Sequence, residues 1–299
     1  MKALTIKSFA KLNLYLDILS REPSGYHTLD MIMQSISIAD ELTFSHIPEM
    51  KVMINSNVKE LQEDNIIQIA YQKIVERFPS QVTSGFQVDL VKNIPMGAGL
   101  AGGSGNGAAM VRACIEVFDL DLKGDDLLDL LLSIGSDVPF CFEGGAQRVQ
   151  GTGDILNPVM SPFKYYLIIN PGIHISTQKA YRSWDDQYWV TGKIHKVKGE
   201  RDKVKEALDD YTKGNIPSFT LYNAFERSLF PSYLTLAKIK EHLIDVGATQ
   251  SLMTGSGSTI FGTFIDEDVC RHACEKLKNL YPFVEIAQDV DFGLLIEAT

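Results

Sequence analysis

The residues that point most directly to chemistry form a glycine-rich stretch, PMGAGLAGGSGNG, which begins at Pro95 and has six glycines from Gly97 to Gly107. Ordering a glycine costs conformational entropy, so such a cluster indicates that the backbone passes close to another group. The stretch lies between an expected strand and an expected helix, where backbone N–H groups and the positive helix end can bind an anion. We therefore predict a phosphate-binding loop, with a tight turn and close strand–helix packing as the structural alternative. The predicted loop residues are Pro95, Met96, Gly97, Ala98, Gly99, Leu100, Ala101, Gly102, Gly103, Ser104 and Gly105.

This loop departs from the two common nucleotide-binding patterns. Gly97 to Gly102 satisfies GxGxxG, but Pro95 and Met96 separate the glycines from the strand that the dinucleotide pattern requires. The same residues nearly fit a Walker A loop, except that Gly103 stands where that loop has its lysine. Because the Walker lysine neutralises the terminal phosphates, another part of the chain must supply the cation.

Lys11 is the candidate cation, since it lies in an expected strand among Phe9, Leu12 and Leu14. A lysine in such a segment is rarely fully buried without a partner, although simple alternation toward solvent is the other interpretation. Asn13 follows two residues later and should share the face of Lys11. We predict that Asn13 orients either Lys11 or a substrate.

A general base is harder to choose, because spacing cannot distinguish among 38 acidic residues. Asp137 follows an expected helix and precedes Val138-Pro139-Phe140, where an ordinary turn carboxylate is the alternative. Tyr26 and His27 follow a glycine turn, and aromatic faces suit nucleobases, but a surface turn also fits.

Hydrophobic periodicity places these residues on elements of both types. Period-two segments at 6–18, 31–45 and 86–92 predict strands, and helical spacing is found from Asp64, after the glycines and from Asp125 to Gly135. A strand from Tyr165, helical segments over 200–246, a strand pair around SLMTGSGSTIFGTFI, a helix near 269–280 and a closing strand follow. The blocks of strands and helices predict an α+β class. We predict two domains, 1–160 and 161–299.

Composition excludes several classes of function. The net charge of −10 over 299 residues argues against nonspecific binding to nucleic acid or to an anionic membrane, while leaving anionic small molecules possible. No apolar run reaches membrane-spanning length, and the N-terminus has no signal-peptide core. The four cysteines have no metal-ligand spacing, so we expect reduced thiols in a cytoplasmic protein.

The motifs together resemble those of the GHMP small-molecule kinases. PMGAGLAGGSGNGAA is similar to their central motif, FAKLNLYLDI to their first motif and LMTGSGSTIFG to their third. The combination of AKLNLYLDI, GYHTLDMIMQSI and GSDVPF resembles the branch that phosphorylates an alcohol of a cytidine-diphosphate-linked polyol in non-mevalonate isoprenoid synthesis. Gly105 departs from a usual serine, which lowers the expected number of phosphate contacts, and Ala101 departs from a usual glycine.

This resemblance implies a fold and a set of roles. The fold would combine an N-terminal domain like the second domain of ribosomal protein S5 with a ferredoxin-like C-terminal domain, leaving the active site in the cleft. ATP would be the phosphoryl donor and Mg²⁺ its companion ion, with Ser104 as a candidate metal contact. The implied catalytic residues are Lys11 and Asp137, with Asn65 and Lys92 near adenine. The implied substrate-binding residues are Asn13, Tyr26, His27 and Tyr181, the last covering the second face of the cytosine unless it is an ordinary packing tyrosine.

Two other functions stay open. A different GHMP kinase, acting on homoserine or a mevalonate derivative, would lack the nucleobase pocket at Tyr26 and His27. A nucleotide-binding module without catalysis would bind ATP and show no turnover. The expected partners are ATP and a CDP-linked polyol, without nucleic acid or membrane; a homodimer is compatible with the sequence. The metal ligands and the role of residues 191–202 are left open.

Overall fold

The computed structural model describes residues 3–23, 25–61, 65–190, 208–209, 211 and 219–297. The polar stretch 191–202 lies outside these residues, as does much of the segment over which helices were expected from residue 200. Within the described part of the chain, no helix is both long and apolar enough to cross a membrane. All four cysteines are free thiols.

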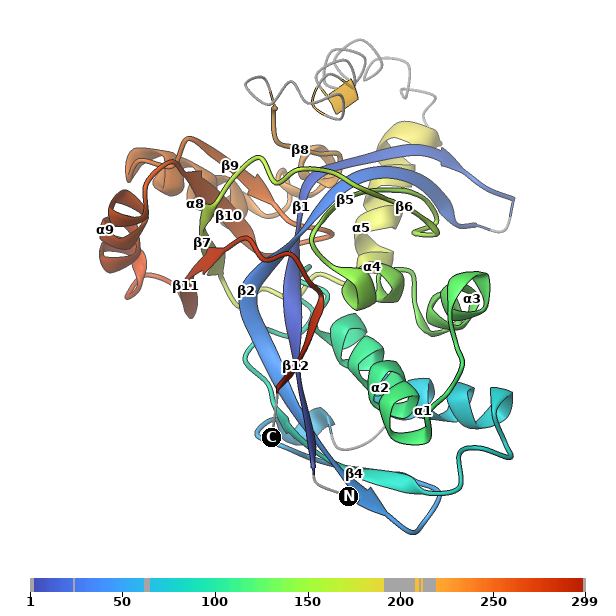
Figure 1. Ribbon diagram of the computed structural model, residues 1–299. Coiled ribbons are helices and arrows are strands. Elements are labelled where there is room, and N and C mark those ends of the chain that lie inside the picture. Colours follow the sequence, from blue (N-terminus) through green and yellow to red (C-terminus); the bar gives the residue numbers. More distant parts are fainter. Residues whose placement is uncertain are drawn as a thin grey trace.

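The first sheet is built around two long antiparallel strands (Figure 1). Its path is β12-β1-β2-β4-β3, and β5, β6 and β8 join it at β2, β5 and β1. The strands are β1 (Leu4–Arg21), β2 (His27–Ile47), β3 (Val52–Ser56), β4 (Gly85–Val91), β5 (Ala146–Gly151), β6 (Ile155–Pro158), β8 (Tyr222–Asn223) and β12 (Leu294–Glu297). Helices α1 (Ile66–Arg77), α2 (Gly102–Phe118), α3 (Gly124–Ile134) and α4 (Val138–Glu143) gather on one side of β1 and β2 (Figure 1). The 3-10 turn η1 covers Lys59–Leu61.

The second sheet has the antiparallel order β11-β7-β10-β9. Its strands are β7 (Tyr165–Asn170), β9 (Gln250–Met253), β10 (Ile260–Phe264) and β11 (Phe283–Gln288). The helical elements of this half are α5 (Thr177–Trp184), the π-helical turn η2 (Asp185–Trp189), α7 (Phe225–Leu229), α8 (Leu234–Asp245) and α9 (Glu267–Leu277). The strands follow one another as β, helices, β, β, helix, β, which is the ferredoxin-like arrangement. The α+β prediction is confirmed.

Strand β1 is buried on both faces, which explains its near-continuous apolar sequence. Ala10, Leu12 and Leu14 pack in a core with residues of β7, β9 and β10, so one face of β1 meets the second sheet. The alternation of side chains then turns Lys11 and Asn13 to the other face. Both side chains are buried and line a cleft.

Local sequence signals set most element ends. Asn65 caps α1 with its side chain, and Gly135 follows α3 at the predicted position. The division into 1–160 and 161–299 stays a prediction; β8 and β12, from the second range, pair with β1 of the first sheet.

Candidate functional site

A cleft of about 630 Å³ lies beside β1 and the glycine loop. Its walls come from β1, the glycine loop, the start of α2, the turn before α4 and the segment leading into α5. It brings together most of the predicted site residues: Lys11, Asn13, Asn65, Lys92, Pro95, Met96, Gly97, Ala98, Gly99, Ala101, Gly102, Gly103, Ser104, Asp137 and Tyr181. Leu100 and Gly105 are buried behind this wall instead.

The glycine loop combines two different structural demands. Gly99 has φ +77°, and a Cβ atom there would lie 2.3 Å from the carbonyl oxygen of Thr254, so close backbone packing requires glycine. Ala101 precedes α2 in the left-handed conformation, φ 56°, and supplies no side-chain cap. The first N–H groups of α2 therefore have no capping side chain and lie at the cleft, where an anion can accept from them.

A second glycine-rich turn, Gly255-Ser256-Gly257-Ser258, packs directly on the first loop. The hydroxyl of Thr254 donates to Gly99 O at 3.3 Å and accepts from the N–H of Asn13 at 3.0 Å. A Cβ atom on Gly255 would lie 3.0 Å from Gly99 O and 3.3 Å from Lys11 Nζ. The N–H of Lys11 in turn donates to the carbonyl of Leu100 at 3.1 Å. Strand β1 and both glycine loops thus form one hydrogen-bonded unit.

A lysine and a carboxylate face each other beside this unit. Lys11 Nζ lies 3.9 Å from Asp137 Oδ2 and donates to Asn13 Oδ1 at 2.5 Å. Asp137 stands at the N-cap position of α4, but its side chain makes no capping hydrogen bond. The lysine is buried and the carboxylate is about one-third exposed, toward the cleft. The arrangement places a cation and a proton acceptor on one side of the space next to the glycine loop.

A second cavity, of about 540 Å³, adjoins the cleft and shares Leu29, Ser136, Thr152, Thr177 and Tyr181 with it. The cavity is lined by Tyr26, which is 69% exposed, and by His27, which is buried. The His27 ring stacks on Tyr181, with centroids 4.5 Å apart and planes 15° from parallel. Tyr181 also packs edge-on against Phe225. Burial raises the pKa of the Tyr181 hydroxyl, and the Asp137 and Asp185 carboxylates raise it further.

Comparisons with known proteins fit this geometry. Residues 65–145 match the model described as "GHMP kinases N terminal domain", and residues 201–282 match "GHMP kinases C terminal". The chain is 36% identical over 296 residues to the 4-diphosphocytidyl-2-C-methyl-D-erythritol kinase of Thermoanaerobacter pseudethanolicus, covering 98% of this chain and 99% of the relative. The chain belongs to the GHMP kinases.

Solved structures agree with that membership. A crystal structure of 4-(cytidine 5'-diphospho)-2C-methyl-D-erythritol kinase superposes with a TM-score of 0.75 at 25% identity, covering 95% of this chain and 98% of the other. The mevalonate kinase of L. major, solved in complex with R-mevalonate, has a TM-score of 0.72 at 16% identity, with 95% of each chain covered. The second likeness concerns the fold alone.

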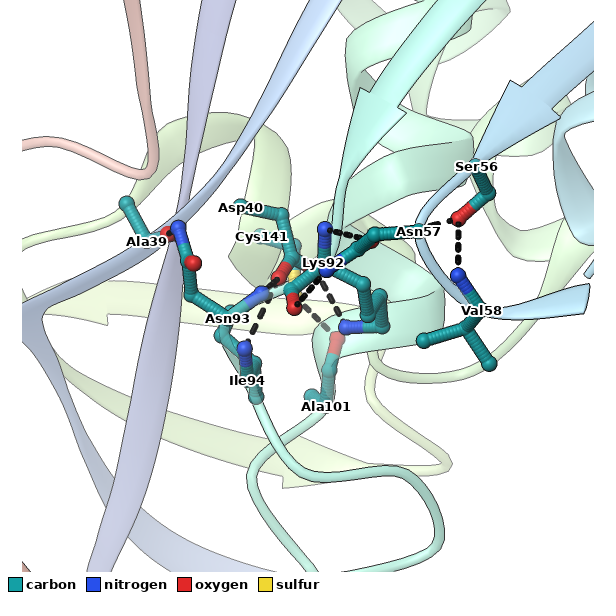
Figure 2. Close-up of polar contacts among 10 residues, drawn as sticks. All are labelled: Ala39, Asp40, Ser56, Asn57, Val58, Lys92, Asn93, Ile94, Ala101 and Cys141. Carbon is teal, nitrogen blue, oxygen red and sulfur yellow. Dashed lines mark hydrogen bonds and ion pairs between the residues drawn. The ribbon is translucent and has the colours of Figure 1, made fainter.

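Asn65 and Lys92 of this GHMP kinase both line the cleft but differ in how they are held. The Asn65 side chain is engaged in capping: it accepts from the N–H of Ile67 and donates to the carbonyl of Leu61. Lys92 forms a buried ion pair with Asp40 (Figure 2). Burial lowers the pKa of the Lys92 ammonium group, against the opposing effect of Asp40.

The departure at position 105 has a local structural explanation. Gly105 lies in the first turns of α2, and a Cβ atom there would be 2.2 Å from the hydroxyl oxygen of Ser8 in β1. Ser8 Oγ is buried and has no hydrogen-bond partner among the described residues. The next residue, Asn106, lines the cleft, and its Oδ1 atom is likewise buried without such a partner. The serine of β1 thus fills space that a side chain at position 105 would occupy.

Three residues of the site were missed by sequence reasoning. Asp40, the ion-pair partner of Lys92, sits in the expected strand 31–45, and a carboxylate inside an apolar strand was the available signal. Asp185 contacts His27 and follows Tyr181 by four residues, a helical spacing. Thr254 directly precedes the second glycine turn. Within the described residues, no group of three or more His, Cys, Asp or Glu side chains is arranged to hold a metal ion.

Proposed function

We propose that this GHMP kinase transfers the γ-phosphoryl group of ATP to a hydroxyl group of 4-diphosphocytidyl-2-C-methyl-D-erythritol, in non-mevalonate isoprenoid precursor synthesis. The relatives that carry this name span nearly the whole chain, at 34 to 36% identity for those from Thermoanaerobacter and Clostridium kluyveri. The observation that carries the proposal is the position of Lys11 and Asp137: they line the cleft that holds the glycine loop and adjoins a second cavity lined by aromatic rings. The cleft beside the glycine loop suits the triphosphate of the donor, and the adjoining cavity suits the nucleobase of the acceptor.

The proposed division of roles follows from charge and position. The N–H groups of Gly102, Gly103 and Ser104 bind the donor phosphates, because the helix start is positive and has no side-chain cap. Lys11 supplies the positive charge that the loop lacks in place of a Walker lysine. Asn13 holds the Lys11 ammonium group and so fixes its position. A magnesium ion, where bound, neutralises phosphate charge, and the Ser104 hydroxyl and the Asp137 carboxylate are oxygen donors of the kind it prefers.

The transfer itself needs one proton acceptor. Asp137 takes the proton of the acceptor hydroxyl while that oxygen forms its bond to the γ-phosphorus and ADP departs with the broken bond's electron pair. The ammonium group of Lys11, 3.9 Å from the carboxylate, offsets negative charge on both the base and the moving group. The nucleobase is held in the second cavity by Tyr26, His27 and Tyr181. We expect a cytoplasmic enzyme, with a homodimer as a possibility that sedimentation can test.

A coupled assay of ADP release tests the proposal. Wild-type protein is assayed with 4-diphosphocytidyl-2-C-methyl-D-erythritol, homoserine and mevalonate at equal concentrations, alongside Asp137→Asn, Lys11→Met and the matched surface control Asp121→Asn. We expect release only with the first acceptor, a loss of about 10²- to 10⁴-fold in kcat for Asp137→Asn, and normal rates for the control. Equal release with homoserine or mevalonate would replace the proposed substrate. ATP binding without turnover of any acceptor would favour the non-catalytic module.

A further inference from the structure

A buried carboxylate holds the histidine of the second cavity. His27 Nε2 lies 2.8 Å from Asp185 Oδ1, and the two side chains are only 6% and 12% exposed. The second oxygen of Asp185 lies 3.4 Å from the guanidinium group of Arg21, so the carboxylate has a cation on its other side. Stacking on Tyr181 fixes the plane of the imidazole. The ring of His27 is therefore constrained both in orientation and in hydrogen bonding.

The contact with Asp185 also determines which ring nitrogen carries hydrogen. A carboxylate can only accept a hydrogen bond, so Nε2 must be the donor. In the neutral imidazole, Nδ1 is then an acceptor. No described residue donates to Nδ1, and His27 lines the 540 Å³ cavity. Because His27 lines that cavity and its ring is held in place, Nδ1 is the acceptor that this side chain has left for a ligand.

We propose that Asp185 is a positioning residue that selects cytosine over uracil by keeping the hydrogen of His27 on Nε2. The inference rests on the proposed function, which requires a cytosine in this enzyme. Cytosine carries an exocyclic amine, a donor, where uracil carries a carbonyl oxygen, an acceptor. The Nδ1 lone pair accepts a hydrogen bond from the cytosine amine and repels the uracil carbonyl. With uracil, two acceptors, Nδ1 of His27 and the carbonyl oxygen, would face each other without a hydrogen between them.

The substitution Asp185→Asn inverts this preference. The carboxamide can donate to Nε2, which stabilises the tautomer with hydrogen on Nδ1 and turns the acceptor into a donor. Affinities for CDP and UDP are measured by calorimetry at pH 8 for wild type, Asp185→Asn, Asp185→Glu and the surface control Asp121→Asn, whose carboxylate is exposed and outside the cavity. We expect wild type to prefer CDP, and the CDP-to-UDP affinity ratio to fall about 10- to 100-fold in Asp185→Asn, the range that one hydrogen-bond mismatch gives. Asp185→Glu should recover part of the ratio, and Asp121→Asn should keep all of it.

A spectroscopic measurement tests the tautomer without relying on the variants. The ¹⁵N chemical shifts of the His27 ring in the full-length wild-type protein should report hydrogen on Nε2. Hydrogen on Nδ1 in the wild type, or an unchanged CDP-to-UDP ratio in a folded Asp185→Asn variant, overturns the inference. Failure of the proposed function is distinguishable, because wild-type protein would then bind CDP and UDP equally or bind neither.

Discussion

The buried ion pair of Asp40 and Lys92 predicts a large and measurable coupling between the first sheet and the glycine loop. One carboxylate oxygen of Asp40 accepts from the Lys92 ammonium group, and the other accepts from the N–H groups of Asn93 and Ile94, each at 2.9 Å (Figure 2). These two peptides lead directly into Pro95 and the glycine loop. Asp40 is fully buried and Lys92 nearly so. After the substitution Asp40→Asn, water therefore cannot reach the Lys92 ammonium group to replace the lost ion pair.

The structure allows the cost of Asp40→Asn to be worked out. The asparagine keeps one oxygen for the two peptide N–H groups but turns an NH₂ group toward the Lys92 ammonium. Removing one partner of a buried pair costs about 3–5 kcal/mol, because the other charge stays buried without compensation. Burial lowers the Lys92 pKa, so loss of its proton limits the cost, and we expect about 2–4 kcal/mol. At about 2–4 °C per kcal/mol for chains of this order of size, the melting temperature falls by about 5–15 °C.

A double-mutant cycle separates the pair from general damage. Asp40→Asn, Lys92→Met and the double variant are unfolded in urea and followed by circular dichroism, with Asp89→Asn, a carboxylate on the neighbouring strand bonded to Asn55, as the matched control. Because Lys92→Met removes the uncompensated charge, we expect the double variant to be more stable than the sum of the singles implies, by about 1–3 kcal/mol. Additive effects within about 0.5 kcal/mol would refute the reasoning, since contacting residues should couple.

Two further predictions concern stability. In the Ser8→Ala background, Gly105→Ala should raise the free energy of unfolding by about 1 kcal/mol, because alanine favours the helix over glycine and the Ser8 oxygen, 2.2 Å from the new Cβ, is gone. In the wild-type background, the stability gained from Gly105→Ala should shrink or reverse. Equal gains in the two backgrounds, measured by urea unfolding, would contradict this. Burial raises the pKa of the Cys270 thiol to about 12 and raises the pKa values of Cys114, Cys141 and Tyr166. As the pH rises, the unfolded chain therefore releases these protons at a lower pH than the folded protein does. The free energy of unfolding should be steady below about pH 8 and fall from there toward pH 11. A urea midpoint that rises over this range would show that the sign is wrong.

Those parts of the fold that depend on local chemistry could be predicted from the sequence. Alternation gave β1 and β2, although both extend beyond 6–18 and 31–45, because strand pairing continues through bulges that interrupt the period. Gly135 ends α3 at the predicted position, because a terminating glycine acts within a few residues of itself. The helix expected from Asp64 begins at Ile66, and Asn65, which was expected near adenine, is its cap. Strands β3, β5, β6 and β8 were not predicted, and β8, with two residues, is too short to show a period.

The site could be predicted only where its residues fall in recognisable motifs. Thr254 bonds Asn13 across 241 residues, Asp185 bonds His27 across 158, and Asp40 bonds Lys92 across 52. Nothing in the spacing of a single sequence links such pairs, because each link depends on how two elements are placed by the whole fold. For the same reason, the sequence could not show that Ser8 fills the space beside Gly105. Their complementary sizes become apparent only when β1 and α2 are packed together.

Close packing, which the structure shows, and the proposed anion binding concern different residues of the glycine stretch. Gly99 faces the backbone of Thr254, and Gly255 faces the backbone of Gly99, so their missing side chains let the two loops touch. The uncapped start of α2, beyond Ala101, is what an anion can use. Strand β1 joins the two functions, because its backbone anchors the loops at Leu100 and Thr254 while its Lys11 side chain faces Asp137. The cation and both loops are therefore held by one strand, which fixes their spacing.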